Sequence, residues 1–344
     1  MAAPFATRVI AWQRTHGRHA LPWQNTDEAY RIWLSEIMLQ QTQVAAVIPY
    51  FERFVSAFPN VHALAQAPVE NVLAHWAGLG YYARARNLHA AAKMLVREFG
   101  GTFPNDAEKI ATLPGIGRST ANAIAAFAYG ARMPILDGNV KRVLARHAGV
   151  EGFPGVRAVE EKLWTEATQR VPAKGSHADM RSYTQGMMDL GAQVCKRSAP
   201  LCMLCPVNAD CNARATQRVD EIPASRPTKV LPHKTKWVVA LLDAENVMVE
   251  RRPDQGIWGG LLSLPEFDSE ADAKAWLKAN VPTAKWVAGT PIEHAFTHYR
   301  LTLHPLRVSL RKTREVPALT AIPRATLATQ GLPAPIKKYL QKIS

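Results

Sequence analysis

The chain has 344 residues, of which 42 are Lys or Arg and 28 are Asp or Glu, so its formal net charge is +14. A hydrophobic content of 47% with only 20% charged residues excludes a disordered chain, and the length suggests two domains. The excess of positive charge indicates a polyanionic partner. No span reaches about 18 clean apolar residues and no signal peptide opens the chain, so we expect a cytoplasmic protein without membrane contact.

Residues 5 to about 214 carry apolar side chains at helical spacing, broken by proline and glycine turns. This pattern predicts an all-α N-terminal part. Within it, Asn105 followed by Glu108 forms a capping-box pattern that predicts a helix ending at Leu113. A second helix is expected to begin at Ser119.

The turn between those two helices reads Leu-Pro-Gly-Ile-Gly. Gly115 and Gly117 lack side chains and therefore let backbone N–H groups approach an anion closely. A plain turn between two helices is the alternative, because glycine is an ordinary helix terminator. The pattern over residues 113–121 resembles the helix-hairpin-helix motif of DNA repair proteins, which grips phosphates regardless of sequence.

Two carboxylates are candidates for chemistry. Glu36 lies on a predicted helix that also carries three glutamines, and uncharged polar groups suit base edges. An exposed Glu on an amphipathic helix is the alternative. Asp137 begins a helix and is a good N-cap, which would stabilise that helix by ~1 kcal/mol. A carboxylate can fill both roles, so the capping role does not exclude a catalytic one.

All four cysteines fall in one window, with gaps of six, two and five residues between them: Cys195, Cys202, Cys205 and Cys211. Two disulfides are one reading, but clustered thiols in a reducing compartment more often hold metal. Zinc sites usually use two close Cys pairs, whereas this window has only one C-x-x-C pair. The stretched spacing favours an iron–sulfur cluster modestly over zinc.

Residues 221–236 contain three prolines, four Lys or Arg and few large apolar groups, which predicts a semi-rigid basic linker. Beyond it, two apolar or alternating runs at 237–243 and 247–252 predict a β-hairpin. A helix near 269–280 and further strands near 285–288 and 300–310 complete the expected α+β domain.

Several motifs together resemble the MutY family of the endonuclease III superfamily, over most of residues 5–214 and weakly beyond. They are the cysteine spacing and the stretches S-E-I-M-L-Q-Q-T-Q at 35–43, G-L-G-Y-Y-A-R-A-R at 78–86, L-P-G-I-G-R-S-T-A at 113–121 and L-D-G-N-V-K-R-V-L at 136–144. The resemblance implies an all-α helix-hairpin-helix glycosylase domain with an iron–sulfur loop, followed by an α+β Nudix-like C-terminal domain. We place the helical domain at 1–220, the cluster loop at 195–211, the linker at 221–236 and the recognition domain at 237–344.

The same resemblance implies base excision repair of double-stranded DNA by a monomer that carries a [4Fe-4S] cluster on the four cysteines. The expected reaction removes adenine mispaired with 8-oxoguanine or guanine. By this resemblance Glu36 is the general acid that protonates adenine at N7, and Asp137 stays ionised to stabilise the oxocarbenium-like sugar. Asn139 and Ser119 complete the catalytic group. Bifunctional relatives carry a Schiff-base lysine at position 119, so serine predicts a mainly monofunctional enzyme.

The resemblance also implies which residues handle the flipped base. Gln41 and Tyr81 match wedge residues beside the orphaned partner base. A core role for Tyr81 or Tyr82 is the alternative, and at least one of these two tyrosines is expected to be structural. Trp23, Gln24 and Gln185 are expected to line the adenine pocket.

In the second domain, Gln255-Gly256-Ile257-Trp258-Gly259-Gly260-Leu261 resembles the opening of a Nudix fold. The Glu-rich metal box of Nudix hydrolases does not follow it, which argues against a second hydrolase. A recognition loop at Phe296, Thr297 and His298 is expected to read 8-oxoguanine, with an ordinary strand-end loop as the alternative.

Two rival functions stay open on the sequence. A pyrimidine-directed glycosylase of the same fold would share the hairpin, the Asp and the cysteines, but Glu36 and Ser119 argue against it. A catalytically silent mispair-binding protein would keep the basic surface and the cysteines without needing Glu36 and Asp137 together.

Overall fold

The computed structural model describes residues 3–227, 230–253, 256–312 and 315–343, so Gln255 of the expected Nudix opening lies outside the described residues. The chain divides into two compact units. The helical unit contains Met1–Gln66 and Asn87–Thr228, and the mixed unit contains Ala67–Arg86 and Lys229–Ser344. No helix in the described parts of the chain combines the length and apolar character needed to cross a bilayer.

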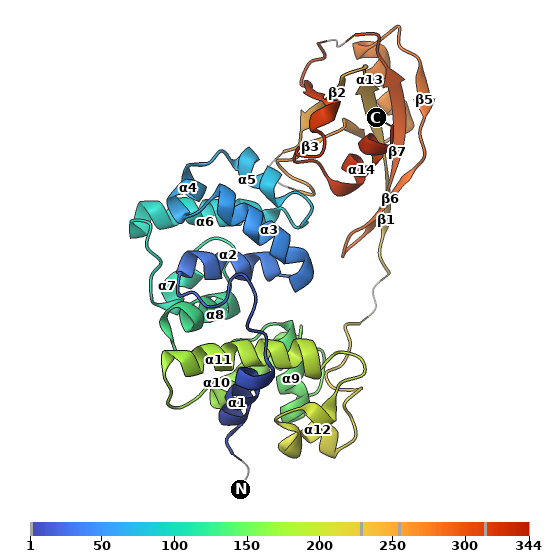
Figure 1. Cartoon of the computed structure of the whole chain (residues 1–344). Helices are drawn as coiled ribbons and strands as arrows, with labels where there is room; N and C mark the ends of the chain where they lie inside the picture. The colour runs from blue at the N-terminus through green and yellow to red at the C-terminus, as the bar shows by residue number, and fades with distance from the viewer. Residues whose placement is uncertain (1–2, 228–229, 254–255, 313–314, 344) are drawn as a thin grey trace. The chain divides into compact units, whose positions relative to one another are not determined.

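The helical unit is built almost entirely from α-helices joined by short turns (Figure 1). Its elements are α1 (Phe5–His16), α2 (Ala29–Leu39), α3 (Val44–Ala57), α4 (Val61–Gln66), α7 (Ala107–Ala111), α8 (Arg118–Tyr129), α9 (Gly138–Ala148), α10 (Arg157–Arg170), α11 (His177–Asp189), the π-helix η1 (Leu190–Val194), the 3₁₀ turns η2 (Cys202–Leu204) and η3 (Asn208–Asp210), and α12 (Asn212–Ala215). Helix α6 (Ala83–Phe99) begins in the mixed unit and continues into the helical one.

Small residues let the helices of this unit approach closely. Helix α8 is rich in buried alanine and packs against α2, α7 and α11. Gly186 of α11 lies against α1, where an added Cβ would come within 2.8 Å of Val9. The close approach of α1 to α11, visible in Figure 1, therefore depends on the missing side chain at position 186.

The first helix of the hairpin differs from the expectation. Helix α7 starts at Ala107 and ends at Ala111, and its N-cap is Asp106, whose carboxylate accepts a hydrogen bond from the Glu108 backbone N–H at 2.8 Å. The expected capping role of Asn105 is therefore wrong by one residue, because the neighbouring aspartate is as good a cap. Helix α8 begins at Arg118, one residue before the expected start.

The mixed unit contains an eight-stranded sheet in which the two longest strands, β1 (His233–Leu242) and β7 (Arg300–Ser309), lie side by side and parallel. The other elements are α5 (Val69–Trp76), β2 (Asn246–Arg251), β3 (Leu262–Ser263), β4 (Glu266–Phe267), α13 (Glu270–Asn280), β5 (Trp286–Ala288), β6 (Ile292–Ala295), β8 (Thr320–Pro323), the turn η4 (Arg324–Thr326) and α14 (Ala334–Ile343). The strand order is β3-β2-β1-β7-β5, with β4, β6 and β8 paired to β1, β7 and β2.

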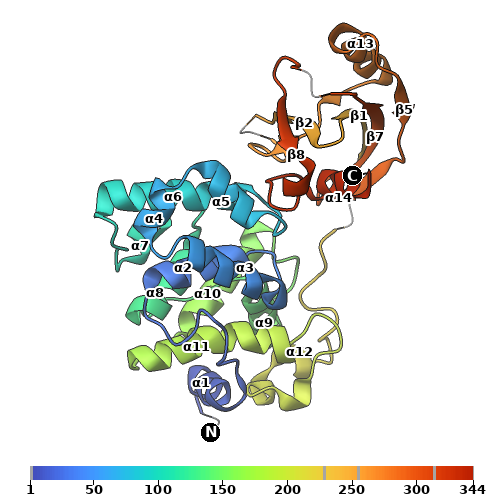
Figure 2. The same ribbon diagram turned by 45° about the horizontal axis from the view of Figure 1, so that its top comes forward.

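Alternate residues of β1 face two different cores. Val238 and Ala240 pack with Leu340 of α14, whereas Val239 and Leu241 pack with α13. Because successive side chains of a strand point to opposite faces, both faces of the sheet are buried and each carries a helix (Figure 2). This explains why β1 reads as a continuous apolar run.

The expected hairpin of β1 and β2 is confirmed, with Leu242 opposite Val247 in an antiparallel pair. Strand β1 begins at His233, inside the segment expected to be a linker. The four extra residues gain strand geometry because they pair in register with the start of β7, His233 opposite Arg300.

Candidate active site

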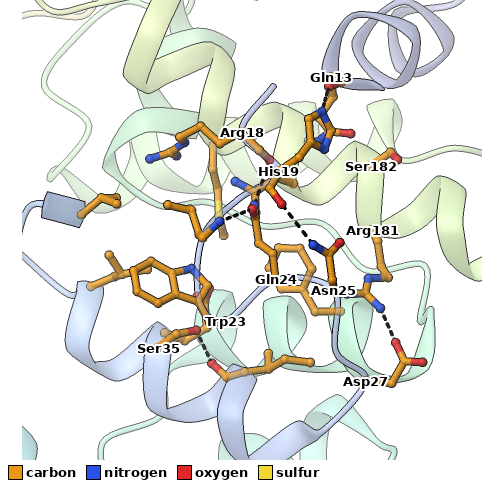
Figure 3. A pocket seen from close by; sticks show the side chains of 18 of the residues that line it. Gln13, Arg18, His19, Trp23, Gln24, Asn25, Asp27, Ser35, Arg181 and Ser182 are labelled. Atoms are coloured by element: carbon orange, nitrogen blue, oxygen red, sulfur yellow. Dashed lines mark hydrogen bonds and ion pairs between the residues drawn. The ribbon is translucent and has the colours of Figure 1, made fainter. Parts of the chain in front are cut away.

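A pocket of about 510 Å³ opens in the helical unit between α1, α2, α11 and the loop that joins α1 to α2. Figure 3 shows the side chains that the loop contributes. Four residues singled out on the sequence line this pocket: Trp23, Gln24, Glu36 and Gln185. They come from three segments that are up to 162 positions apart, so the pocket is a product of the tertiary structure.

Glu36 lies in the last turn and a half of α2, on a helix whose neighbouring residues are core. Burial raises the pKa of the Glu36 carboxyl to about 8, and the nearby negative charge of Asp137 raises it further in the same direction. This carboxyl therefore keeps its proton at neutral pH. A carboxylic acid at a pocket wall can donate a proton to a bound group.

Asp137 is the N-cap of α9, where its Oδ1 accepts hydrogen bonds from the backbone N–H groups of Asn139 at 2.7 Å and Val140 at 2.8 Å. Burial raises the pKa of Asp137, while the two backbone hydrogen bonds and the positive charges of Arg142 and Lys141 lower it. Burial is the larger effect, so the fold opposes the ionised state expected for this residue.

Asp137 is not among the described residues that line the pocket, but it lies close enough to act on Glu36 electrostatically. A negative charge on Asp137 therefore favours the protonated form of Glu36. Sharing of a single proton between two such groups is the usual result, because two buried like charges repel.

Ser119 holds the segment that leads into Asp137. Its Oγ accepts a hydrogen bond from the backbone N–H of Leu136 at 2.8 Å. The first turn of α8 is thus joined to the residue before the α9 cap. The Ser119 hydroxyl therefore holds the backbone at Leu136, next to Asp137, in place.

The Asn139 side chain lies close to η1. Its Oδ1 accepts from Nη2 of Arg142 at 3.0 Å, and Arg142 also donates to the carbonyls of Gly191 and Cys195, each at 2.7 Å. An added Cβ at Gly191 would come within 2.6 Å of the Asn139 side chain. The beginning of α9 and the first cysteine are consequently connected through one guanidinium group.

The Gln24 amide is used within its own loop. Its Oε1 accepts from the Leu21 backbone N–H and its Nε2 donates to the Arg18 carbonyl, each at 3.0 Å. Figure 3 shows this side chain beside Trp23 and Arg18. Gln24 lines the pocket as expected. Both ends of its amide form hydrogen bonds with the backbone of its own loop, so the amide stabilises the loop.

Sequence reasoning missed two residues that surround Gln185. Asp189 is fully buried and pairs with Arg18, whose Nη2 lies 2.6 Å from Asp189 Oδ1. Gln185 Nε2 donates to the same Oδ1 at 2.8 Å. The spacing of four residues between Gln185 and Asp189 on one helix was a usable signal, but the arrival of Arg18 from 171 positions away was not.

The two hairpin glycines have different surroundings. Gly115 has φ +78° and an added Cβ would come within 2.8 Å of Asn87. Gly117 is the N-cap of α8, and no atom lies within 4 Å of its would-be Cβ. The first glycine is required by the backbone conformation and packing, and the second leaves open space before the N-terminus of α8.

Three positive side chains that follow the hairpin in the sequence are engaged by the protein itself. Arg118 stacks over Trp164 at 3.9 Å, and Lys141 pairs with Glu160 at 2.7 Å. Arg146 is buried and donates to the carbonyls of Ile222 and Lys196. Their first role is structural, since guanidinium groups satisfy several carbonyls at once.

The four cysteines line one small cavity and carry free thiols. Burial raises the pKa of Cys205 to about 12, and the charges of the other three cysteines act in the same direction. The four sulfurs thus share one neighbourhood. Among the described residues, no three or more His, Cys, Asp or Glu side chains converge tightly enough to hold one metal ion.

Gln41 and Tyr81, the expected wedge residues, both have positive φ, +57° and +50°. Gln41 is exposed in the helical unit, and Tyr81 is 47% exposed in the mixed unit, beneath the guanidinium of Arg84 at 5.5 Å. Tyr81 therefore has no core role, whereas Tyr82 is buried, as expected for at least one of these two tyrosines. Non-glycine residues in this conformation are strained and are often found at functional sites.

The expected recognition loop is the turn between β6 and β7. Phe296 is anchored there, with its ring 4.7 Å from Tyr299 and 5.3 Å from Trp258. Thr297 and His298 are exposed. The side chains of Thr297 and His298 are thus exposed to solvent, on a loop that the packed ring of Phe296 holds in place.

The acidic residues that follow the Nudix-like opening form ion pairs and hydrogen bonds within the protein. Asp268 pairs with Lys236, Glu270 pairs with Lys274 at 2.8 Å, and Asp272 bonds the Ser269 N-cap at 2.6 Å. These contacts agree with the expectation that no Nudix metal box is present here.

Comparisons with known proteins place the two regions. Residues 34–169 match the model of the HhH-GPD superfamily base excision DNA repair protein, and residues 237–342 match that of the NUDIX domain. The structure of a thermostable thymine-DNA glycosylase aligns with a TM-score of 0.55 at 25% identity, covering 62% of this chain and 95% of that chain. The fold is that of a helix-hairpin-helix glycosylase with an added Nudix-like domain, as the sequence predicted.

Full-length relatives are more specific. The chain is 37% identical over 309 residues to the adenine DNA glycosylase of Buchnera aphidicola subsp. Acyrthosiphon pisum (strain APS), which covers 89% of this chain and 87% of that protein. It is 31% identical over 393 residues to the adenine DNA glycosylase of Homo sapiens, covering 95% and 70%. The chain belongs to the adenine DNA glycosylase family, which confirms the resemblance to MutY.

Proposed function

We propose that the protein removes adenine from double-stranded DNA by hydrolysing the bond between the base and deoxyribose, and that its target adenine lies opposite 8-oxoguanine or guanine. The observation that carries this proposal is the position of Glu36 at the wall of the pocket, where burial and the charge of Asp137 raise the pKa of its carboxyl to about 8. Adenine is a poor leaving group, so cleavage needs a proton on the base and negative charge near the sugar.

In the proposed reaction, Glu36 donates its proton to N7 of the flipped adenine. The glycosidic electron pair leaves with the base, and positive charge develops on the sugar. The Asp137 carboxylate stabilises that charge. A water then bonds to the sugar carbon and gives up one proton, which returns Glu36 to its protonated form. When Glu36 gives its proton to adenine, the two carboxyls together gain one negative charge. This charge faces the cationic sugar, so protonation of the base also strengthens the stabilisation of the sugar.

Three further assignments belong to this proposal. Gly117 offers open space before the N-terminus of α8, where a DNA phosphate can approach backbone N–H groups. Gln41 and Tyr81 fill the gap left by the flipped base, supported by their exposure and their strained backbone. Thr297 and His298 contact the partner base, supported by their exposure on an anchored loop.

We further propose that the four cysteines hold a [4Fe-4S] cluster. In such a cluster each thiolate binds its own iron, so the sulfurs share a neighbourhood without converging on one ion. A single zinc ion would need all four within about 2.3 Å of one point. The four cysteines line one cavity, which supports the proposal, and a bound cluster would fix the loop from Cys195 to Cys211 around that cavity. Iron and sulfide analysis of the purified protein tests this assignment.

In this scheme one chain acts on DNA without a second copy, so the expected monomeric state stays a prediction. The expected cytoplasmic location is a second prediction. Light scattering at micromolar concentration checks the first of them.

A single excision assay tests the central proposal. Duplexes with adenine opposite 8-oxoguanine, adenine opposite guanine, and an oxidised pyrimidine opposite guanine are compared under single-turnover conditions. Adenine release from the first two and none from the third is expected. Release of the pyrimidine lesion alone would assign the rival activity, and tight binding without any release would assign a silent mispair-binding protein.

The Glu36→Gln variant tests the acid itself. It retains the shape and hydrogen-bonding capacity of the side chain but removes the proton that the reaction needs. Excision is expected to fall by at least ~10² to 10⁴ while mispair binding survives. Retained turnover would exclude Glu36 as the acid.

A further inference from the structure

The pocket contains a polar contact that neither the reaction scheme nor the family assignment uses. Gln185 and Asp189 lie one turn apart on α11, so both side chains project from the same face of the helix. Gln185 lines the pocket and is 9% exposed, whereas Asp189 is fully buried behind it.

Arg18 fixes the Asp189 carboxylate from the opposite side. The Arg18 backbone N–H donates to Oδ2 at 2.8 Å, and the Arg18 Nε donates to Oδ1 at 2.6 Å. The guanidinium also forms an ion pair with Oδ1 at 2.6 Å. Both oxygens are held, so this carboxylate has one orientation and is compensated by a positive charge.

The Gln185 amide is held by the same group through its nitrogen, with Nε2 donating to Asp189 Oδ1 at 2.8 Å. An ionised carboxylate only accepts hydrogen bonds. The NH₂ end of the amide must therefore face Asp189, since the reversed amide would place a carbonyl oxygen against a carboxylate oxygen. The chemistry of the partner decides this orientation.

The opposite end of the amide is available to a ligand. No described residue donates a hydrogen bond to Gln185 Oε1, and the side chain lines the pocket. Gln24, the other amide of the pocket, differs because the backbone of its loop uses both of its ends.

We propose that Asp189, held by Arg18, is a positioning residue that fixes the Gln185 carbonyl towards the pocket, and that this acceptor selects a base with an exocyclic amine. Adenine presents an N6 amino donor, whereas hypoxanthine presents an oxygen at the same ring position. A fixed acceptor attracts the first and repels the second. A freely rotating amide would accommodate both.

This inference rests on the proposed adenine glycosylase activity, and the experiment separates the two. Single-turnover excision rates are measured for adenine and for hypoxanthine, each opposite 8-oxoguanine, and their ratio is compared among variants. The ratio cancels general losses of activity. If the wild-type protein releases no adenine, the proposed function fails; if it releases adenine but the variants leave the ratio unchanged, only the positioning role fails.

Asp189→Asn is the first variant. Its side chain can donate as well as accept, so the Gln185 amide is no longer held in one orientation. The preference for adenine is expected to fall roughly 10- to 100-fold, the worth of a hydrogen bond to a charged group. A folded Asp189→Asn protein with the wild-type ratio would overturn the inference.

Two further variants keep the test decisive if Asp189→Asn does not fold. The double change Asp189→Asn with Gln185→Glu reverses donor and acceptor while conserving net charge, and it again turns an acceptor oxygen towards the pocket. It is expected to recover the preference for adenine, and a folded double variant without that preference overturns the inference. Gln185→Met leaves the Arg18–Asp189 pair intact and removes the acceptor, so an unchanged ratio there also overturns it.

Glu166→Gln is the matched control. It replaces one carboxylate by an amide within an Arg ion pair of the same unit, with Arg170, away from the pocket. Its excision ratio is expected to equal that of the wild type. A thermal unfolding curve for each variant, read by circular dichroism, establishes which proteins are folded.

Discussion

The Ser119 hydroxyl accepts a hydrogen bond from the Leu136 backbone N–H at 2.8 Å, so the hairpin helix and the segment that carries Asp137 are fastened to each other. The proposed phosphate contact at the α8 N-terminus and the carboxylate proposed to face the sugar are thereby kept in a fixed position relative to each other. A serine here supports the backbone of the site and leaves no amine for covalent chemistry.

Ser119→Ala is expected to destabilise the protein by roughly 1–3 kcal/mol, because the Leu136 N–H loses its partner in a partly buried place. Excision should fall as well, since Asp137 is less well fixed. Urea unfolding and single-turnover excision measure the two effects. Thr165→Ala is the control: its hydroxyl bonds the Glu161 carbonyl on an exposed helix face, and a change within about 0.5 kcal/mol is expected.

Borohydride reduction during the reaction tests for an amine-linked intermediate. Because position 119 has no amine, little covalent protein–DNA product is expected, and the abasic strand should stay intact until it is treated with base. A bifunctional lysine-bearing glycosylase serves as the positive control. Efficient trapping of this protein would show that another amine reaches the sugar.

The pH dependence of excision follows from the raised pKa of Glu36, which is about 8. The protonated form is the active one, so the rate should stay high at neutral pH and fall as pH rises above about 8. The fall approaches tenfold per pH unit once Glu36 is mostly ionised. A single-turnover profile from pH 6 to pH 10 checks this, and a descending limb centred near the ordinary Glu pKa would contradict it.

Stability should depend on the same group. The folded protein binds the Glu36 proton more tightly than the unfolded chain, whose Glu titrates near 4.5, so this contribution is complete below pH 4.5 and is lost as pH rises through about 8. Glu36→Gln removes the dependence. Relative to the wild type, the free energy of unfolding of the variant should rise by roughly 1–4 kcal/mol between pH 5 and pH 9. Urea unfolding at these two pH values measures the change.

The two hairpin glycines form a natural pair for comparison. Gly115→Ala is expected to destabilise the protein by roughly 1–3 kcal/mol, because its φ of +78° is strained for alanine and its Cβ would meet Asn87. Gly117→Ala has no such neighbour and should change stability by less than about 0.5 kcal/mol. Its added methyl group should weaken DNA binding instead, as measured by fluorescence anisotropy on an unmodified duplex.

Discrimination of the partner base is assigned to the β6–β7 loop. Thr297→Ala removes an exposed hydroxyl and leaves the aromatic anchor of the loop in place. The ratio of excision opposite 8-oxoguanine to that opposite guanine should fall several-fold, while excision opposite guanine stays close to that of the wild type. A point change is the better test than removal of residues 230–344, because Arg86 donates to the Gly259 carbonyl within the mixed unit at 2.5 Å. An equal loss with both partner bases would count against the assignment.

Local patterns predicted much of this architecture. The α13 helix and the β1–β2 hairpin both depend on residues close together in the chain. Their physical basis is short-range: side-chain period, capping chemistry and turn residues act over a few positions. The same short range explains the error at Asn105, since two adjacent good caps compete and packing of the short α7 decides between them.

The sequence by itself indicated the helical and the mixed domain and several of their elements, and through its motifs which residues are candidates for chemistry. Only the tertiary structure decided their environment: that burial beside Asp137 raises the pKa of Glu36, that the Gln24 amide is used by its own loop, and that Arg18 reaches Asp189 across 171 positions. Proton affinity and the orientation of a hydrogen-bonding group depend on solvent exclusion and on neighbours brought together by packing. No local run of residues contains that information.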